Sequence, residues 1–69
     1  MNTAQRIGKN LKEARKYCGL TQSEAAAKLN MVQQQYSRFE TGKFELNYDQ
    51  ILTLCALYNI TPNELFDID

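Results

Sequence analysis

The sequence predicts an all-α protein of five short helices around one core. Four helix starts carry a capping box, in which an Asn or Thr is followed three residues later by a side chain that can bond back to it. These pairs are Asn2 with Gln5, Thr21 with Glu24, Asn47 with Gln50, and Thr61 with Glu64. Apolar residues recur at helical intervals, and no segment alternates with a period of two for long enough to suggest a strand. With 69 residues, of which 43% are apolar, the chain is expected to form one domain over 1–69.

The helix boundaries follow from capping and turn residues. Gly19 and Gly42 are expected to end the first and third helices, and Asn30 to form a left-handed turn after the second. Pro62 fits the first position of the last helix, where its missing N–H costs nothing. The helices are expected over about 3–18, 22–29, 33–41, 48–58 and 62–66. The inward positions predicted for the first, second and fourth helices are Ile7, Leu11, Ala14, Ala25, Ala26, Leu29, Ile51, Leu52, Leu54, Cys55, Leu57 and Tyr58.

The composition excludes several classes of protein. There is no His, and Cys18 and Cys55 are isolated, so no metal site and no cofactor are expected. An enzyme is disfavoured because there is no activated nucleophile and no pair of acids in an apolar setting. No apolar run approaches a membrane span, and the polar, basic N-terminus does not resemble a signal peptide. A soluble cytoplasmic protein without membrane contact is expected.

Charge is distributed unevenly along a chain whose formal net charge is zero. All eight Lys and Arg lie within residues 1–43, beside three Glu, which leaves that half at +5. Residues 44–69 hold five acids and no base, which leaves −5. This pattern predicts one basic face and one acidic face, although chance in a small chain is the alternative.

The third predicted helix begins with three glutamines. On a helical wheel Val32 lies toward the core, together with Tyr36 and Phe39. Gln35 lies beside this apolar group, and its side chain is expected to fold back to the Val32 N–H as half of a capping box.

The other two glutamines fall on the outer side of the same helix. Gln34, Ser37 and Arg38 point away from the core, and Gln33 lies on the flank. A glutamine amide can bond bidentately to adenine, and an arginine guanidinium to guanine. This surface is therefore either a solvated polar face or a face that reads bases, and the wheel alone does not decide between them.

Several motifs point to a known family. Two helices joined by a turn are predicted in TQSEAAAKLNMVQQQYSRFETG, preceded by GLTQ, with an Ala at position 26, closed by RFETGK and followed by ITPNELF. In combination these features resemble the phage repressor and Cro-like helix-turn-helix family, with the motif at about 21–41. The resemblance covers nearly the whole chain. It implies sequence-specific binding of double-stranded DNA by a small transcriptional regulator.

The resemblance also implies roles for individual residues. The base-reading positions are Gln33, Gln34, Ser37 and Arg38. The positions that contact phosphate are Gln22, Thr41 and Lys43. Arg15 and Glu40 correspond to an ion pair that ties the first helix to the third. Val32 departs from the usual Ser or Thr cap of the third helix, which is expected to cost about 1 kcal/mol.

The family mechanism implies a homodimer on a pseudo-palindromic operator, acting as a repressor more readily than as an activator. With no second domain expected, the dimer contact would come from the acidic half. Its candidate residues are Leu57, Leu65, Phe66 and Ile68, although these equally suit the closure of the core. No small-molecule effector is expected, and the protein would be bacterial or phage-encoded and nucleoid-associated when bound. The alternative is a protein-interaction module, such as an antitoxin or anti-repressor.

Overall fold

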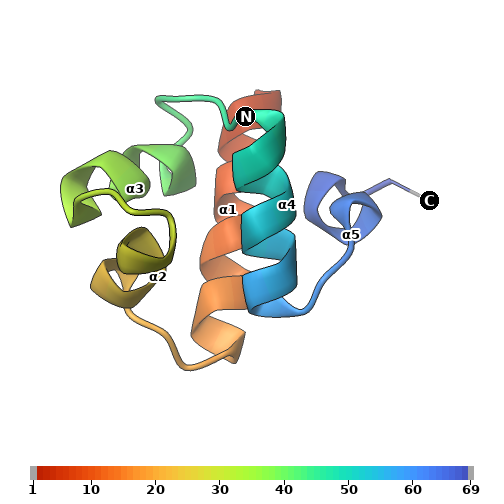
Figure 1. The fold of residues 1–69 in the computed structure, drawn as a ribbon. Coiled ribbons are helices and arrows are strands. Elements are labelled where there is room, and N and C mark those ends of the chain that lie inside the picture. The colour runs from red at the N-terminus through yellow and green to blue at the C-terminus, as the bar shows by residue number, and fades with distance from the viewer. Residues whose placement is uncertain (1, 69) are drawn as a thin grey trace.

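The computed structural model describes residues 2–68, and over that range its regular elements are all helices, without a strand (Figure 1). The elements are α1 Thr3–Tyr17, α2 Gln22–Lys28, α3 Gln33–Glu40, α4 Tyr48–Tyr58 and α5 Pro62–Phe66. The predicted all-α class with five helices is therefore confirmed. α1, α2 and α3 each end one residue earlier than expected, because Cys18, Leu29 and Thr41 serve as their C-caps.

All four predicted capping boxes form. At the start of α1, Asn2 Oδ1 accepts from the Gln5 N–H at 2.8 Å, and Gln5 Oε1 accepts from the Asn2 N–H at 3.0 Å. The same reciprocal pair begins α2, α4 and α5. Each box satisfies two backbone N–H groups that the first turn of a helix leaves without a partner.

Left-handed residues end the helices and set the directions between them. Asn30 has φ 59° in the turn between α2 and α3, as its sequence position predicts. Gly19 and Gly42, which follow α1 and α3, have φ 72° and 79°. Such angles are cheap for glycine and tolerable for asparagine, so short connections can turn the chain sharply here.

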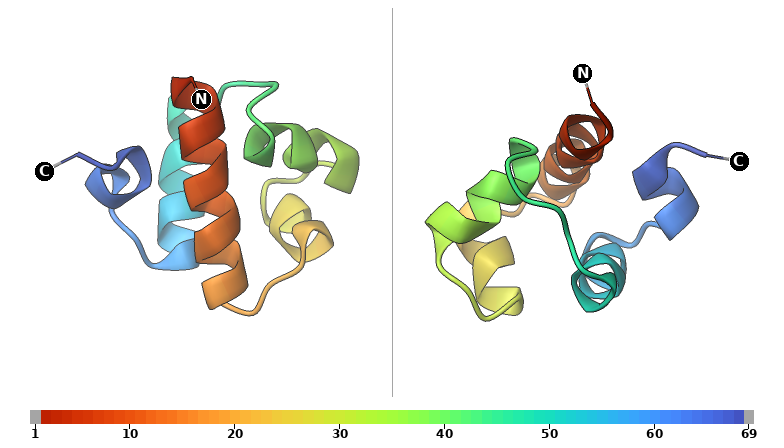
Figure 2. Two further views of the ribbon diagram at one scale, coloured as in Figure 1. Left: turned by 180° about the vertical axis from the view of Figure 1, so that it is seen from behind. Right: turned by 90° about the horizontal axis from the view of Figure 1, so that it is seen from above.

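The helices form two groups around α1. α2 and α3 pack against each other, and α3 also packs against α1, while α5 contacts both α1 and α4 (Figures 1 and 2). The basic half of the sequence, 1–43, thus builds α1, α2, α3 and the start of the connection after α3, and the acidic half, 44–69, includes the rest of that connection, α4 and α5.

The core joins residues from all five helices. Its largest fully buried side chains are Tyr36, Leu11, Leu54 and Leu65. The Tyr36 and Tyr58 hydroxyls lie 2.6 Å apart and share a hydrogen bond inside the core. Burial raises the pKa of Tyr58 to about 12 and that of Tyr36 further, so both hydroxyls keep their protons. One of the two can therefore donate the hydrogen bond to the other.

Two sequence expectations about burial are wrong, and the choice left open for Leu65 is decided. Leu52 was expected inward but is 60% exposed, because the buried arc of α4 is narrower than its apolar arc. Val32 is 67% exposed, because its extended backbone places it outside the helical wheel that put it near the core. Leu65 is fully buried, so it closes the core and is not available to a dimer surface.

The crossing of α1 and α3 leaves no room for a side chain at Gly8. A Cβ at this buried position would lie 2.5 Å from the Phe39 carbonyl oxygen and would also collide with that of Glu40. Alanine normally favours a helix over glycine by about 1 kcal/mol. We expect Gly8→Ala instead to lower the free energy of unfolding by about 1–3 kcal/mol, measured by urea denaturation.

The matched control is Lys12, one turn later on the exposed side of α1. Lys12→Ala should be more stable than Lys12→Gly by about 1 kcal/mol, the ordinary helical order. A Gly8→Ala variant as stable as the unmodified protein would contradict the close approach of the two helices.

Candidate nucleic-acid interface

A buried ion pair connects α1 to the end of α3. Arg15 Nε donates to Glu40 Oε2 at 2.7 Å, and Arg15 Nη2 donates to Glu40 Oε1 at 3.2 Å. Arg15 Nη1 also donates to the Leu20 carbonyl oxygen at 2.9 Å. The Arg15 and Glu40 side chains are only 10% and 2% exposed. This bidentate geometry fixes the orientation of α3 relative to α1.

Both members of the pair are charged. Burial favours the neutral form of Glu40, but the hydrogen bonds that its carboxylate accepts outweigh this effect and lower its pKa. The hydrogen bond to Glu40 raises the pKa of Arg15 against the opposing effect of its own burial. The pair therefore stays ionised inside the fold at neutral pH.

A chain of amide hydrogen bonds runs from Glu40 to the first residue of α3. Gln22 Nε2 donates to Glu40 Oε1 at 3.1 Å, and Gln22 Oε1 accepts from Gln33 Nε2 at 3.4 Å. Gln33 Oε1 in turn accepts from Ser23 Oγ at 2.7 Å. A carboxylate only accepts, so Gln22 must turn its NH2 group inward and its carbonyl toward Gln33. The buried Glu40 carboxylate thus sets the orientation of the side-chain amides of Gln22 and Gln33.

The predicted base-reading glutamines differ as a result. The carbonyl of Gln33 is occupied by Ser23 and one amide N–H is directed to Gln22, which leaves one N–H. Gln34 is exposed, and its side chain makes no hydrogen bond within residues 2–68. Of these two glutamines, Gln34 is the one that presents both a complete donor and a complete acceptor to a partner.

Arg38 is held by an aromatic ring that the sequence analysis missed. Its Cζ lies 5.3 Å from the centroid of the Phe44 ring, and Phe44 is 48% exposed. The Lys43 and Phe44 N–H groups both donate to the Arg38 carbonyl oxygen, at 2.9 and 3.3 Å. The ring therefore supports the guanidinium while leaving its outer edge in solvent.

The remaining predicted positions lie around the same helix. Thr41 and Lys43 are exposed just beyond the end of α3, and the Thr41 hydroxyl donates to the Arg38 carbonyl oxygen at 3.3 Å. Ser37 is half-buried. Gln22 is also half-buried, and its amide faces inward as described above.

The start of α3 corrects one expectation. Val32 is the N-cap, with φ −79° and ψ 156°, and its side chain makes no capping hydrogen bond. Gln35 was expected to bond back to the Val32 N–H, but its side chain is exposed and no such bond forms. Both residues instead present their side chains to solvent. α3 is thus held by packing and by its far end, without a side-chain cap at its start.

Two supporting residues could not be read from the sequence. Ser23 reaches Gln33 across the turn between two helices, and Phe44 reaches Arg38 after the chain leaves α3. Each contact depends on how the chain folds back, and no helical spacing signals it.

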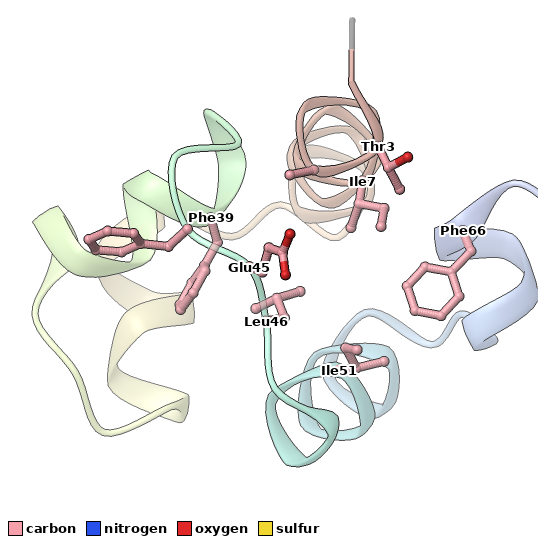
Figure 3. Close-up of a pocket in the computed structure, with 9 residues that line it drawn as sticks. Thr3, Ile7, Phe39, Glu45, Leu46, Ile51 and Phe66 are labelled. Atoms are coloured by element: carbon pink, nitrogen blue, oxygen red, sulfur yellow. The ribbon is translucent and has the colours of Figure 1, made fainter.

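An apolar cavity of about 250 Å³ lies among α1, the end of α3, the α3–α4 connection, α4 and α5. Ile7, Leu46, Ile51 and Phe66 point into this space (Figure 3). Phe66, which was a candidate for the dimer surface, therefore lines this partly open hollow together with residues of α1. The cavity is smaller than most ligand pockets and has few polar groups, such as Thr3 and Glu45, to orient a ligand.

Across residues 2–68, no helix combines the length and apolar character that crossing a membrane requires. Over the same range there is no group of three or more His, Cys, Asp or Glu side chains placed to hold a metal ion.

The lowered pKa of Glu40 predicts an acid-dependent loss of stability. The unfolded carboxyl binds a proton near its ordinary pKa of 4.5, above the pKa that it has in the fold. The contribution of the pair is therefore complete above about pH 4.5 and is lost as pH falls through the lower folded pKa. We expect urea titrations from about pH 7 to pH 3 to show this fall, and Glu40→Gln to flatten it.

Glu24 provides the matched control. Hydrogen bonds at the Thr21 cap lower its pKa too, but its carboxylate is exposed. Glu24→Gln should remove a smaller part of the slope below pH 4.5 than Glu40→Gln. Equal effects of the two changes would show that the buried pair does not dominate acid unfolding.

Comparison with known proteins agrees with this architecture. A family model described as helix-turn-helix matches residues 11–65, which span α2, α3 and α4 and parts of α1 and α5. The HTH-type transcriptional regulator ImmR of Bacillus subtilis (strain 168) is 41% identical over 63 residues, which cover 91% of this chain and 50% of that protein. The chain thus spans about half the length of this relative. These matches confirm the resemblance noted in the sequence, and the chain belongs to the Cro/C1-type helix-turn-helix family.

Proposed function

We propose that this chain is a DNA-binding transcriptional regulator that reads duplex DNA with the first turns of α3. The observation that carries the proposal is the polar, exposed start of α3, which is connected by hydrogen bonds to the buried Glu40 carboxylate. Gln33 and Gln34 open this helix, and the hydrogen-bonded chain through Gln22 ties the first of them to Glu40. A helix presented in this way suits the major groove, where the N-terminal residues of a recognition helix contact base edges.

The two glutamines and Arg38 would contribute different contacts. Gln34 has a free carbonyl and a free NH2 group, which match the N6 donor and N7 acceptor of adenine. Gln33 keeps one N–H for an acceptor on a neighbouring base or phosphate. Arg38, supported by Phe44, matches the two acceptors of guanine, O6 and N7. Ser37 lies one turn from Gln33, and its shorter side chain would reach only DNA groups that lie close to the helix.

Phosphate contacts would come from both ends of the motif. Lys43 and Thr41 follow α3 in an exposed connection. Gln22 starts α2 and retains one amide N–H beyond those used inside the fold. Contacts of this kind set the position and register of a protein on DNA without reading its sequence.

We further propose that the regulator acts as a homodimer on a pseudo-palindrome, with its two α3 helices about one DNA turn, or 34 Å, apart. The name of the B. subtilis relative describes a transcriptional regulator. Repression is the simpler mode, because a protein bound over a promoter blocks it without any further contact. Ile68 is 56% exposed and Leu57 is half-buried at the acidic half, which leaves these two of the four candidates for the dimer contact.

A second candidate is a module that binds another protein. Tyr48 and Leu52 are 85% and 60% exposed and lie one turn apart on α4. Neighbouring exposed apolar side chains on one helix face suit a protein contact. Replacing both by Ser would abolish partner binding in that case and would leave DNA binding unchanged.

The first experiment is selection of duplexes from a random DNA pool, followed by binding measurements on the preferred duplex. We expect Gln34→Ala to weaken binding to that duplex by about 1–3 kcal/mol and to relax selection at one base pair in each half-site. The matched control is Gln35→Ala, which removes the same side chain within the same turn. It should leave both affinity and preference unchanged.

Lys43→Ala tests a phosphate contact, in contrast to the base contact tested by Gln34→Ala. Loss of a phosphate contact should weaken all duplexes alike and reduce the slope of log affinity against log salt by about one. If Gln34→Ala and Lys43→Ala had the same effect on every sequence, the assigned roles would be wrong. If no preferred duplex emerged from the pool, the proposed function itself would fail.

The dimer proposal has its own test. Ile68→Asp places a charge on the exposed apolar side chain at the end of the acidic half. We expect it to weaken self-association about ten-fold or more by sedimentation equilibrium, because burial of such a side chain is worth about 1.5–3 kcal/mol. Thr53→Asp, which adds the same charge at an exposed position of α4, should leave self-association unchanged. A protein that stays monomeric on the preferred duplex would contradict the dimer.

A further inference from the structure

Val32 is an exposed aliphatic residue at the start of α3, beside the candidate interface. Its side chain is 67% exposed and lies outside the packed core cluster, whereas the preceding Met31 packs against that core. It directly precedes Gln33 and Gln34. An isolated exposed valine needs no explanation on most surfaces, but this one occupies a position where a polar residue would stabilise the protein.

That position is the N-cap of α3. The other four helices begin with Asn or Thr, and each of those residues makes a capping hydrogen bond. Val32 makes none and leaves the first N–H groups of α3 without a side-chain acceptor. Neither the core nor the helix start therefore accounts for a valine here.

The proposed function supplies a reason. We infer that Val32 contacts the C5 methyl group of a thymine in the major groove and so adds a base preference to that of the glutamines. This inference rests on the proposed DNA binding by α3. It names one further residue that determines specificity and the chemical group that this residue recognises.

Base chemistry supports the pairing of a valine with two glutamines. In the major groove an A·T pair shows N7 and N6 of adenine beside O4 and the methyl group of thymine. Gln34 has the free donor and acceptor that adenine requires. Thymine is the only base that carries a methyl group on its major-groove edge, and an aliphatic side chain is the complement that removes it from water. Glutamine and valine together would thus read both strands of one A·T step.

The same contact separates thymine from cytosine. Cytosine carries hydrogen where thymine carries the methyl group, and it presents an N4 donor in place of the O4 acceptor. An aliphatic residue can sense the methyl group but forms no hydrogen bond with either base. Uracil differs from thymine by the methyl group alone, so it isolates this contact from all others.

The test uses the preferred duplex with each thymine replaced in turn by deoxyuridine. For the unmodified protein we expect one position in each half-site at which this change weakens binding about three- to five-fold, the effect of losing one buried methyl-sized contact. For Val32→Ala, the thymine and uracil duplexes should bind equally at that position. Their common affinity should match that of the unmodified protein for the uracil duplex.

Three further variants separate the contact from stability. Val32→Ser restores a hydroxyl cap, so it should raise the free energy of unfolding by about the worth of a cap and yet bind as Val32→Ala does. Val32→Thr keeps one methyl group and should retain part of the preference for thymine. Leu52→Ala removes an exposed aliphatic side chain from α4 and should leave the uracil pattern unchanged.

The outcomes are distinguishable. A preferred duplex that is insensitive to uracil at every position would overturn the inference and leave DNA binding intact. So would a uracil-sensitive position that persists in Val32→Ala, because the methyl group would then be read by another residue. If no preferred duplex exists, the proposed function and this inference fail together.

Discussion

The buried Arg15–Glu40 pair is the interaction on which the rest of the site depends. Two hydrogen bonds hold the carboxylate against the guanidinium, and a third ties the guanidinium to the backbone after α1. Removal of one member would leave the other charged and buried, at a cost of about 3–5 kcal/mol. Since Glu40 can only accept hydrogen bonds, it also dictates how the Gln22 amide lies, and through it that of Gln33. A structural ion pair thereby orders side chains on the surface of the protein.

Because of this order, the exposed polar side chains of α3 differ in how many donors and acceptors they keep free. Gln33 is largely committed to α2, Gln34 is free, and Arg38 rests on the ring of Phe44. A partner that binds α3 therefore meets two side chains, Gln33 and Arg38, whose positions are set before binding, which reduces the entropy that must be lost on association. Val32 fits the same description, because a β-branched side chain has few rotamers to lose.

The helix that carries these groups is short and poorly capped, so its stability comes from its neighbours. Tyr36 and Phe39 bury its inner face, and the Tyr36 hydroxyl bonds to Tyr58 within the core. Gly8 lets the end of α3 approach the backbone of α1 closely. An eight-residue helix would not persist alone in water. Its geometry is thus a property of the whole domain.

The sequence by itself determined the five helices, their four capping boxes and the left-handed turn at Asn30, because capping and turn chemistry act over three or four residues. It also indicated the family and the outward side of α3. Only the tertiary structure decided which apolar residues are exposed, such as Leu52 and Val32, and which are buried, such as Leu65. Helical periodicity gives the direction of a side chain but not the width of the buried arc, and it fails at a cap whose backbone is extended. The links from Glu40 to Gln33 join separate helices, so no local pattern encodes them.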